Sequence, residues 1–236
     1  MSTFVLVHGA WHGGWCWYKI VARLEAKGHT VFAPDMPGHG TDRTPIETVT
    51  LDDIVARIGG VIGKAAEPVV LVGHSYGGAV ITQTAERHAD RIARLVYVAA
   101  FLLKNGQSTL DAAAGDDNDL TGHILFAPDG KTATADPAIH RKAFYAGCAD
   151  EDVALARLSI GPEAAAGFAT PMRTTPEKFG RVPRFYVECT KDRAISIAKQ
   201  RQMHAALPCA RVFTLETDHS PFFSAPDALV DCLTAP

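Results

Sequence analysis

The chain alternates short apolar segments with stretches whose apolar residues recur at helical spacing, and this alternation restricts its fold more than any other feature. Apolar strands that are separated by helices are typical of a parallel sheet covered on both faces. We therefore expect an α/β fold with a mostly parallel central sheet and helices on both faces. The predicted strands are Thr3–Val7, Thr30–Ala33, Pro68–Val72, Arg94–Ala100, Arg184–Cys189 and Arg211–Glu216. The predicted helices are Tyr18–Ala26, Leu51–Lys64, Gly77–Ala89, Ile195–Ala206 and Pro226–Leu233.

The alternation is interrupted once, between about Leu103 and Arg181. Ala, Gly, Asp and Pro dominate this stretch, as in Ala112–Asp119, and its hydrophobic periodicity is weak. We predict that it forms an inserted cap of short helices rather than a second core. A length of 236 residues fits a single α/β domain, because such domains often have about 200–250 residues. We therefore expect one domain over residues 1–236.

Composition argues against several classes of partner and location. Lys and Arg total 23 against 26 Asp and Glu, a net charge of −3, so no global attraction to nucleic acid or to an anionic membrane is expected. No apolar stretch approaches the roughly 18 residues of a membrane span, and no basic signal-peptide segment precedes Thr3–Val7. The five cysteines are scattered and never form C-x-x-C, which favours free thiols in a reducing compartment. We expect a cytoplasmic monomer or homodimer.

The strongest local motif is Gly73-His74-Ser75-Tyr76-Gly77, which lies between a predicted strand and a predicted helix. G-x-S-x-G alone is a weak pattern, but this context is that of a nucleophile elbow. The turn is so tight that the positions two before and two after the serine crowd the backbone, and glycines have no Cβ to clash. Ser75 then lies at a helix N-terminus, whose free N–H groups favour negative charge. We predict that Ser75 is a nucleophile.

A serine hydroxyl is a poor nucleophile until a base takes its proton. His219 is the best candidate, because it follows the last predicted strand, and loops after parallel strands meet at one edge of the sheet. His74 is adjacent to Ser75 but points away in such a turn. Other histidines are expected to be solvated (His88, His140 and His204) or to have no obvious partner (His29 and His39).

The base in turn needs a carboxylate that holds its tautomer. Asp192 fits, because it follows the strand Arg184–Cys189 directly. Glu188 belongs to that strand, and Asp218 is adjacent to His219 and badly placed to meet its ring.

Attack on a carbonyl also needs donors for the oxyanion that forms. The elbow supplies one, the backbone N–H of Tyr76. The loop after the first strand, His8-Gly9-Ala10-Trp11, supplies the second, which we assign to the backbone N–H of Ala10. We expect His8 to brace this loop by hydrogen bonding rather than to react.

Several segments together resemble the α/β-hydrolases, in particular the branch that contains plant methyl esterases and hydroxynitrile lyases. They are Phe4–Trp17, Ala33–Gly40, Leu71–Gly78, Val187–Ser196 and the pair Asp218-His219. The order Ser75, Asp192, His219 is the α/β-hydrolase order. The resemblance implies that these three form a catalytic triad, with an oxyanion hole at Ala10 and Tyr76.

Two positions depart from the lyases within this branch. The lyases carry a lysine directly after the catalytic histidine and a threonine after the first histidine of the early loop, where this chain has Ser220 and Gly9. Loss of a cation from a site built for cyanide disfavours cyanohydrin cleavage. We therefore predict a serine carboxylic ester hydrolase. Hydroxynitrile lyase activity and a non-catalytic small-molecule receptor remain the alternatives.

The expected partner is a small to medium hydrophobic or aromatic ester, with no cofactor and no metal. Six residues are candidates to line its pocket: Trp11, Phe101, Phe126, Phe144, Phe168 and Met172. A dehydrogenase is disfavoured, because Trp15 takes the place of a third nucleotide-loop glycine and no tyrosine has a lysine four residues on. A zinc site at His8 and His12 is disfavoured, because the glycines around them oppose a helix and no glutamate follows His8.

Overall fold

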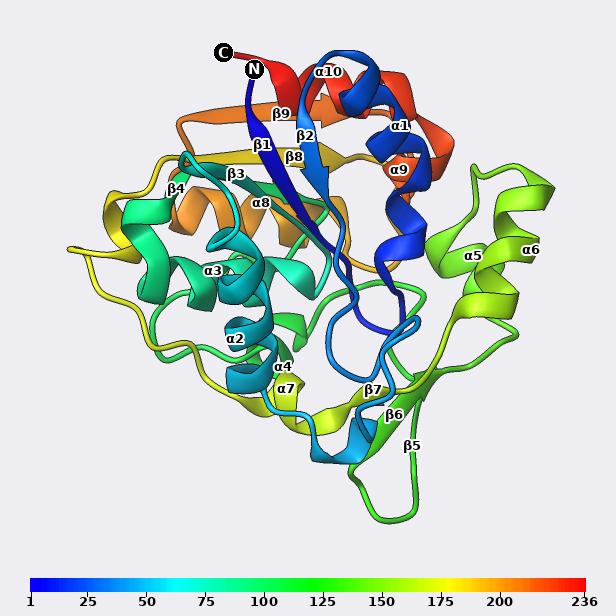
Figure 1. Cartoon of the computed structure of the whole chain (residues 1–236). Helices are drawn as coiled ribbons and strands as arrows, with labels where there is room; N and C mark the ends of the chain where they lie inside the picture. The colour runs from blue at the N-terminus through cyan, green and yellow to red at the C-terminus, as the bar shows by residue number, and fades with distance from the viewer.

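A six-stranded, fully parallel sheet forms the centre of the protein in a computed structural model that describes residues 1–236 (Figure 1). Its strand order is β2-β1-β3-β4-β8-β9. The strands are β1 (Thr3–Val7), β2 (Thr30–Phe32), β3 (Val69–His74), β4 (Ile92–Val98), β8 (Arg184–Cys189) and β9 (Arg211–Leu215). Every residue of β3 is buried, which explains why its sequence is a continuous apolar run. The predicted α/β fold class is confirmed.

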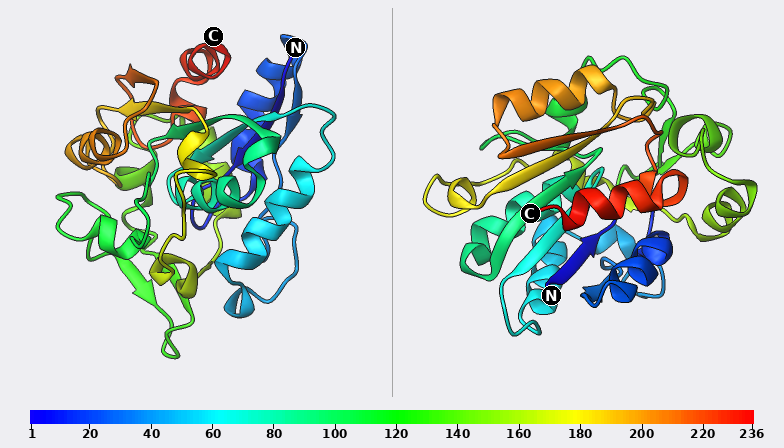
Figure 2. Two further views of the ribbon diagram at one scale, coloured as in Figure 1. Left: turned by 90° about the vertical axis from the view of Figure 1, so that its left-hand side faces the viewer. Right: turned by 90° about the horizontal axis from the view of Figure 1, so that it is seen from above.

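Helices cover both sides of this sheet (Figure 2). They are α1 (Tyr18–Ala26), α2 (Leu51–Ile62), α3 (Gly77–His88), α8 (Ile197–Ala206), α9 (Pro221–Ser224) and α10 (Pro226–Thr234). Helix α2 begins with a reciprocal capping box between Thr50 and Asp53, which satisfies two backbone donors at its first turn. Short 3₁₀ turns are η1 (Gly14–Trp17), η2 (Ile46–Thr48), η3 (Ala89–Arg91) and η4 (Phe179–Arg181).

Most predicted boundaries differ from the observed ones by no more than two residues, and one shift is informative. The helix predicted to start at Ile195 begins at Ile197, because the Ser196 side chain caps it and accepts a hydrogen bond from the Lys199 N–H. The N–H groups of Ala194 and Ile195 bind the Asp192 carboxylate instead. The residues just before this helix therefore shape the candidate site.

The segment between β4 and β8 forms the cap, and it is more than a set of short helices. Its helices are α4 (Thr109–Ala113), α5 (His140–Phe144), α6 (Asp150–Ser159) and α7 (Ala165–Ala169). It also contains an antiparallel sheet of β5 (Ile124–Phe126), β6 (Thr132–Ala135) and β7 (Glu163–Ala164), in the order β5-β6-β7. The expectation of helices alone was wrong in this respect, because strands of two to four residues are too short to show an alternating pattern.

Two further properties concern the state of the cysteines and the length of the apolar helices. All five cysteines are free thiols, and four of them are buried. No helix combines the length and the apolar character that a membrane crossing requires.

Candidate active site

The topology of the sheet brings two loops together at the carboxyl ends of its central strands. The chain runs outward from β1 to β2, then returns to β3 on the other side of β1. Ligands of open α/β sheets bind where the strand order reverses in this way. Val7 at the end of β1 pairs with Gly73 in β3. The loop that begins at His8 therefore lies beside the turn that contains Ser75.

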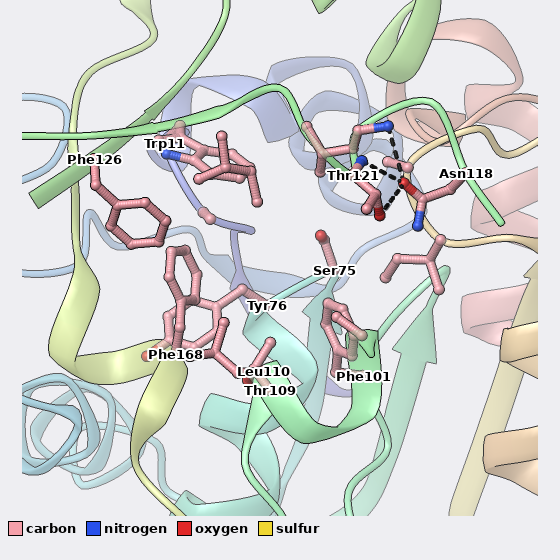
Figure 3. Close-up of a pocket in the computed structure, with 16 residues that line it drawn as sticks. Trp11, Ser75, Tyr76, Phe101, Thr109, Leu110, Asn118, Thr121, Phe126 and Phe168 are labelled. Carbon is pink, nitrogen blue, oxygen red and sulfur yellow. Dashed lines mark hydrogen bonds between the residues drawn. The ribbon is translucent and has the colours of Figure 1, made fainter. Parts of the chain in front are cut away.

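The turn after β3 has the strained geometry of a nucleophile elbow. Ser75 has a φ of +53°, a conformation that costs a non-glycine residue about 1–3 kcal/mol and usually has a functional reason. A Cβ at Gly73 would lie 2.5 Å from the Gly77 carbonyl oxygen, and one at Gly77 would lie 2.7 Å from the His8 carbonyl oxygen. The crowding expected at both glycines is therefore present, and the Ser75 side chain lines a pocket (Figure 3).

Asp192 and His219 come into direct contact, although 27 residues separate them in the chain. The Asp192 Oδ2 atom lies 2.8 Å from His219 Nδ1, and both side chains are buried. Asp192 also accepts hydrogen bonds from the Ala194 N–H, the Ile195 N–H and the Gln200 amide. Because an ionised carboxylate only accepts, the shared proton belongs to His219 Nδ1. His219 Nε2 then keeps its lone pair, as a general base requires.

His74 connects the serine turn to the loop of His219. Its Nε2–H donates to the His219 carbonyl oxygen at 2.7 Å, and the two ring centroids are 4.5 Å apart. Burial and the nearby His219 ring lower the pKa of His74 well below its usual value, so His74 is neutral at pH 7. As expected, it does not line the pocket beside Ser75.

Two backbone N–H groups next to Ser75 have no partner in the protein. Ala10 and Tyr76 are 4% and 1% exposed and both line the pocket, yet neither N–H donates a hydrogen bond to a protein atom. Buried backbone donors without partners are rare. These are the two N–H groups that the sequence indicated for an oxyanion hole.

The pocket is apolar and carries no charged side chain (Figure 3). It has an empty volume of about 600 Å³, including its open mouth, and 12 of its 16 lining residues are hydrophobic. Of the six candidates from the sequence, Trp11, Phe101, Phe126 and Phe168 line it. Phe144 and Met172 do not: they are 1% exposed and belong to the core.

The remaining nine lining residues all come from the cap or from the loop after Asp192 and were missed from the sequence. They are Thr109, Leu110, Ala113, Asn118, Leu120, Thr121, Ile124, Ala194 and Ile195. In the cap, weak periodicity left no signal of which side chains point inward.

Four histidines expected to be solvated or unpaired are instead partnered. His29 accepts a hydrogen bond from the Ser2 N–H. His39 is buried and contacts Glu163, His140 is buried and donates to the Ala135 carbonyl oxygen, and His204 contacts Glu188. The partner of His39 lies 124 residues along the chain, so local sequence does not indicate it. Glu188 is also bound by Arg201 and Thr214, which leaves it no contact with His219.

Gly9 is packed so closely against the serine turn that no larger residue fits. A Cβ at this position would lie 2.8 Å from the Ser75 Cβ and 3.0 Å from His74 Nδ1. Since Ser75 is the predicted nucleophile and a displacement of about 1 Å at a nucleophile can lower the rate by about 100-fold, we expect Gly9→Ala to lower kcat for a p-nitrophenyl ester by roughly 10- to 100-fold. Steady-state kinetics would measure it, with Gly60→Ala as the control, because a Cβ at Gly60 meets open space. Equal rates for both variants would contradict this expectation.

The family model described as the alpha/beta hydrolase family matches residues 4–232. The protein therefore belongs to the α/β-hydrolase family.

Its relatives within the family include methylesterases. It is 35% identical to the putative chloroplastic methylesterase 11 of Arabidopsis thaliana over 97% of this chain, and it spans 62% of that relative's length. It is 30% identical to the pyrethroid hydrolase of Sphingobium wenxiniae, with 99% of this chain and 86% of the relative covered. The crystal structure of a methylesterase from Arabidopsis is similar with a TM-score of 0.86 at 28% identity, covering 99% of this chain and 97% of that one.

Proposed function

We propose that the protein is a serine carboxylic ester hydrolase that acts on small to medium hydrophobic or aromatic esters through an acyl-enzyme intermediate. The observation that carries this proposal is the pocket in which Ser75 lies beside two unpaired buried N–H groups. The contact between Asp192 and His219 supports it, as do relatives named methylesterase and pyrethroid hydrolase.

In the proposed mechanism, His219 Nε2 takes the proton of Ser75 as its Oγ attacks the ester carbonyl. The N–H groups of Ala10 and Tyr76 donate to the tetrahedral oxyanion. His219 then protonates the leaving alcohol, and water activated by the same ring releases the acid. Asp192 holds the imidazole tautomer and stabilises the imidazolium that forms in each step.

The uncharged pocket predicts discrimination by substrate charge. No lining side chain is basic, so a carboxylate in the acyl group would be buried without a partner, at a cost of several kcal/mol. We expect kcat/KM for p-nitrophenyl butyrate to exceed that for the p-nitrophenyl hemiester of succinate by at least about 100-fold. Kinetics with the two esters at low ionic strength would measure this ratio. Similar values would mean that the acyl group binds elsewhere.

The two alternative functions make different predictions for the same site. A lyase of this branch has a cation after the histidine, whereas Ser220 is buried here with a hydroxyl that has no partner. A receptor would not need the strained backbone of Ser75 or the buried contact between Asp192 and His219.

The deciding experiment is hydrolysis of p-nitrophenyl butyrate by the protein, with mandelonitrile cleavage measured in parallel and with labelling by a fluorophosphonate. Ester turnover with one label on Ser75 and no cyanide release supports the proposal. Cyanide release without ester turnover would favour the lyase. Binding of an ester without turnover or label would favour the receptor.

For location and assembly, we propose the cytoplasm, because five free thiols suit a reducing compartment, and a monomer or homodimer of the single capped domain. Localisation of a tagged full-length protein and light scattering test these two points.

A further inference from the structure

Trp11, which follows the candidate oxyanion donor Ala10, is held by the small sheet of the cap. Its φ is +66°, a strained conformation for a bulky residue. Its indole N–H donates to the Ala133 carbonyl oxygen in β6 at 3.0 Å, and its own carbonyl oxygen accepts from the Gly161 N–H at 3.0 Å. Its backbone N–H donates to Glu163 Oε2 in β7 at 3.3 Å. The cap therefore determines the backbone conformation at Trp11.

Three of the four backbone groups in the two peptide units that flank Ala10 are bound by buried side chains. His8 Nε2 accepts from a backbone N–H, so its Nδ1–H donates to the Gly9 carbonyl oxygen at 2.8 Å. The His12 Nδ1–H donates to the Ala10 carbonyl oxygen at 2.8 Å. The Trp11 N–H is the third bound group. The Ala10 N–H alone stays free, with its direction set by the other three.

Glu163 is itself part of a buried ion pair. It is 0% exposed, and its Oε2 atom lies 3.0 Å from His39 Nε2. The other ring nitrogen, Nδ1, lies 3.0 Å from the Pro37 carbonyl oxygen. Both neighbours only accept hydrogen bonds, so both ring nitrogens carry protons and His39 is an imidazolium. Burial alone would lower the pKa of His39, but Glu163, the bond to Pro37 and nearby Asp35 together raise it.

We propose that Glu163, carried by the cap strand β7, is a positioning residue for the oxyanion hole. Paired with the His39 imidazolium, its carboxylate holds the Trp11 N–H and so directs the Ala10 N–H toward the substrate oxyanion. Figure 1 shows β7 beside the loops that follow β1 and β2. The cap and the loop His8-Gly9-Ala10-Trp11, here called the oxyanion loop, thus act as one unit. The inference rests on the proposed esterase function.

The ion pair also gives the site a dependence on pH. The titratable and charged groups that face the pair are the Asp35 carboxylate, the His8 and His12 rings and the Tyr76 hydroxyl. Burial lowers the pKa of His12 to about 4 and that of His8 well below its usual value, so both stay neutral. Because the pKa of His39 is raised, its imidazolium form is retained to a higher pH than in an unperturbed histidine, and the pair is lost as pH rises through that raised pKa. A neutral His39 has one N–H for two acceptors.

The test replaces Glu163 with glutamine, which has almost the same shape but no charge. The Trp11 N–H and the His39 ring both bind the same carboxylate oxygen, Glu163 Oε2. If the glutamine NH₂ group takes the position of this oxygen and bonds to His39, it cannot accept from the Trp11 N–H, which is left unpaired. We expect Glu163→Gln to lower kcat for p-nitrophenyl butyrate by roughly 10- to 100-fold with KM within about twofold, because the donor acts on the transition state.

The matched control is Asp152→Asn. Asp152 is another buried cap carboxylate paired with a cation of the main body, Lys19 at 2.6 Å, but it does not contact the oxyanion loop. We expect its kcat to stay within about twofold of the wild type even where its unfolding temperature falls. Equal kcat losses in Glu163→Gln and Asp152→Asn would overturn the inference, because they would indicate a general effect of losing a buried pair.

A second variant tests the role of the charge. His39→Gln keeps a donor toward Glu163 that does not titrate. We expect the kcat of the wild type to fall as the pH is raised into the alkaline range, and the kcat of His39→Gln not to show this fall. The same fall in His39→Gln would overturn the inference.

If the wild type shows no ester turnover, the proposed function fails, and hydrogen exchange at the Trp11 amide decides the inference separately. Faster exchange in Glu163→Gln than in Asp152→Asn supports it, and equal exchange overturns it.

Discussion

Replacing Ser75 with alanine is expected to lower kcat for p-nitrophenyl butyrate by about 10⁴-fold or more, because in the proposed mechanism its Oγ atom forms the acyl-enzyme. The fold should survive, because the backbone contacts of Ser75, with Val98, Gly78 and Phe101, do not involve its side chain. Steady-state kinetics and a thermal unfolding curve measure both parts of this prediction.

Ser220→Ala is the matched control for the serine. Ser220 is also a buried serine whose Oγ has no hydrogen-bond partner, and it is adjacent to His219. We expect this variant to keep kcat within a few-fold of the wild type. Near-normal turnover by Ser75→Ala, after removal of contaminating esterase, would show that Ser75 is not the nucleophile.

Asp192→Asn is expected to lower kcat by about 10⁴-fold, because the asparagine would hold the His219 ring in the tautomer that cannot act as a base. Asp192 Oδ1 accepts from the Ala194 and Ile195 N–H groups, so the asparagine oxygen will take that position. Its NH₂ group then faces His219 Nδ1, which must accept, and the ring proton moves to Nε2. A ring protonated at Nε2 cannot take the proton of Ser75. The measurement is kcat over a range of pH.

Two neighbouring carboxylates serve as controls for this change. Asp218 accepts from the Gly147 N–H and the Ser224 hydroxyl, and Glu188 binds Arg201, so neither contacts the His219 ring. We expect Asp218→Asn and Glu188→Gln to keep most of their turnover. A nearly silent Asp192→Asn together with an inactive Glu188→Gln would show that the acid was misassigned.

The elements of the main sheet were predictable because their signals are local. The apolar run at Arg184–Cys189 and the helical spacing at Tyr18–Ala26 have the same bounds in the structure. The serine turn was recognisable for the same reason, since the G-x-S-x-G pattern spans five consecutive residues. The crowding at Gly73 comes from within this turn, from Gly77, whereas the crowding at Gly77 comes from His8 in the loop after β1. Asp192 and His219 could be inferred because parallel strands bring the loops that follow them to one edge.

The cap followed no such rule, and its strands β5, β6 and β7 were missed. Its elements are short and are stabilised by contacts with distant residues, as the pairing of Glu163 with His39 shows. Local propensity is a weak guide where tertiary contacts decide the conformation. Phe144 and Phe168 illustrate the same limit, because nothing in the sequence distinguishes the core residue from the pocket residue.

By itself, the sequence determined the fold class, the family resemblance, and the residues proposed as nucleophile, base, acid and oxyanion donors. These depend on short-range patterns and on the topology that such patterns impose. Only the tertiary structure decided which side chains line the pocket, that it carries no charge, and that a cap carboxylate holds the oxyanion loop. Those features arise where segments more than a hundred residues apart meet, and burial there turns contacts such as Glu163 with His39 into strong, specific interactions.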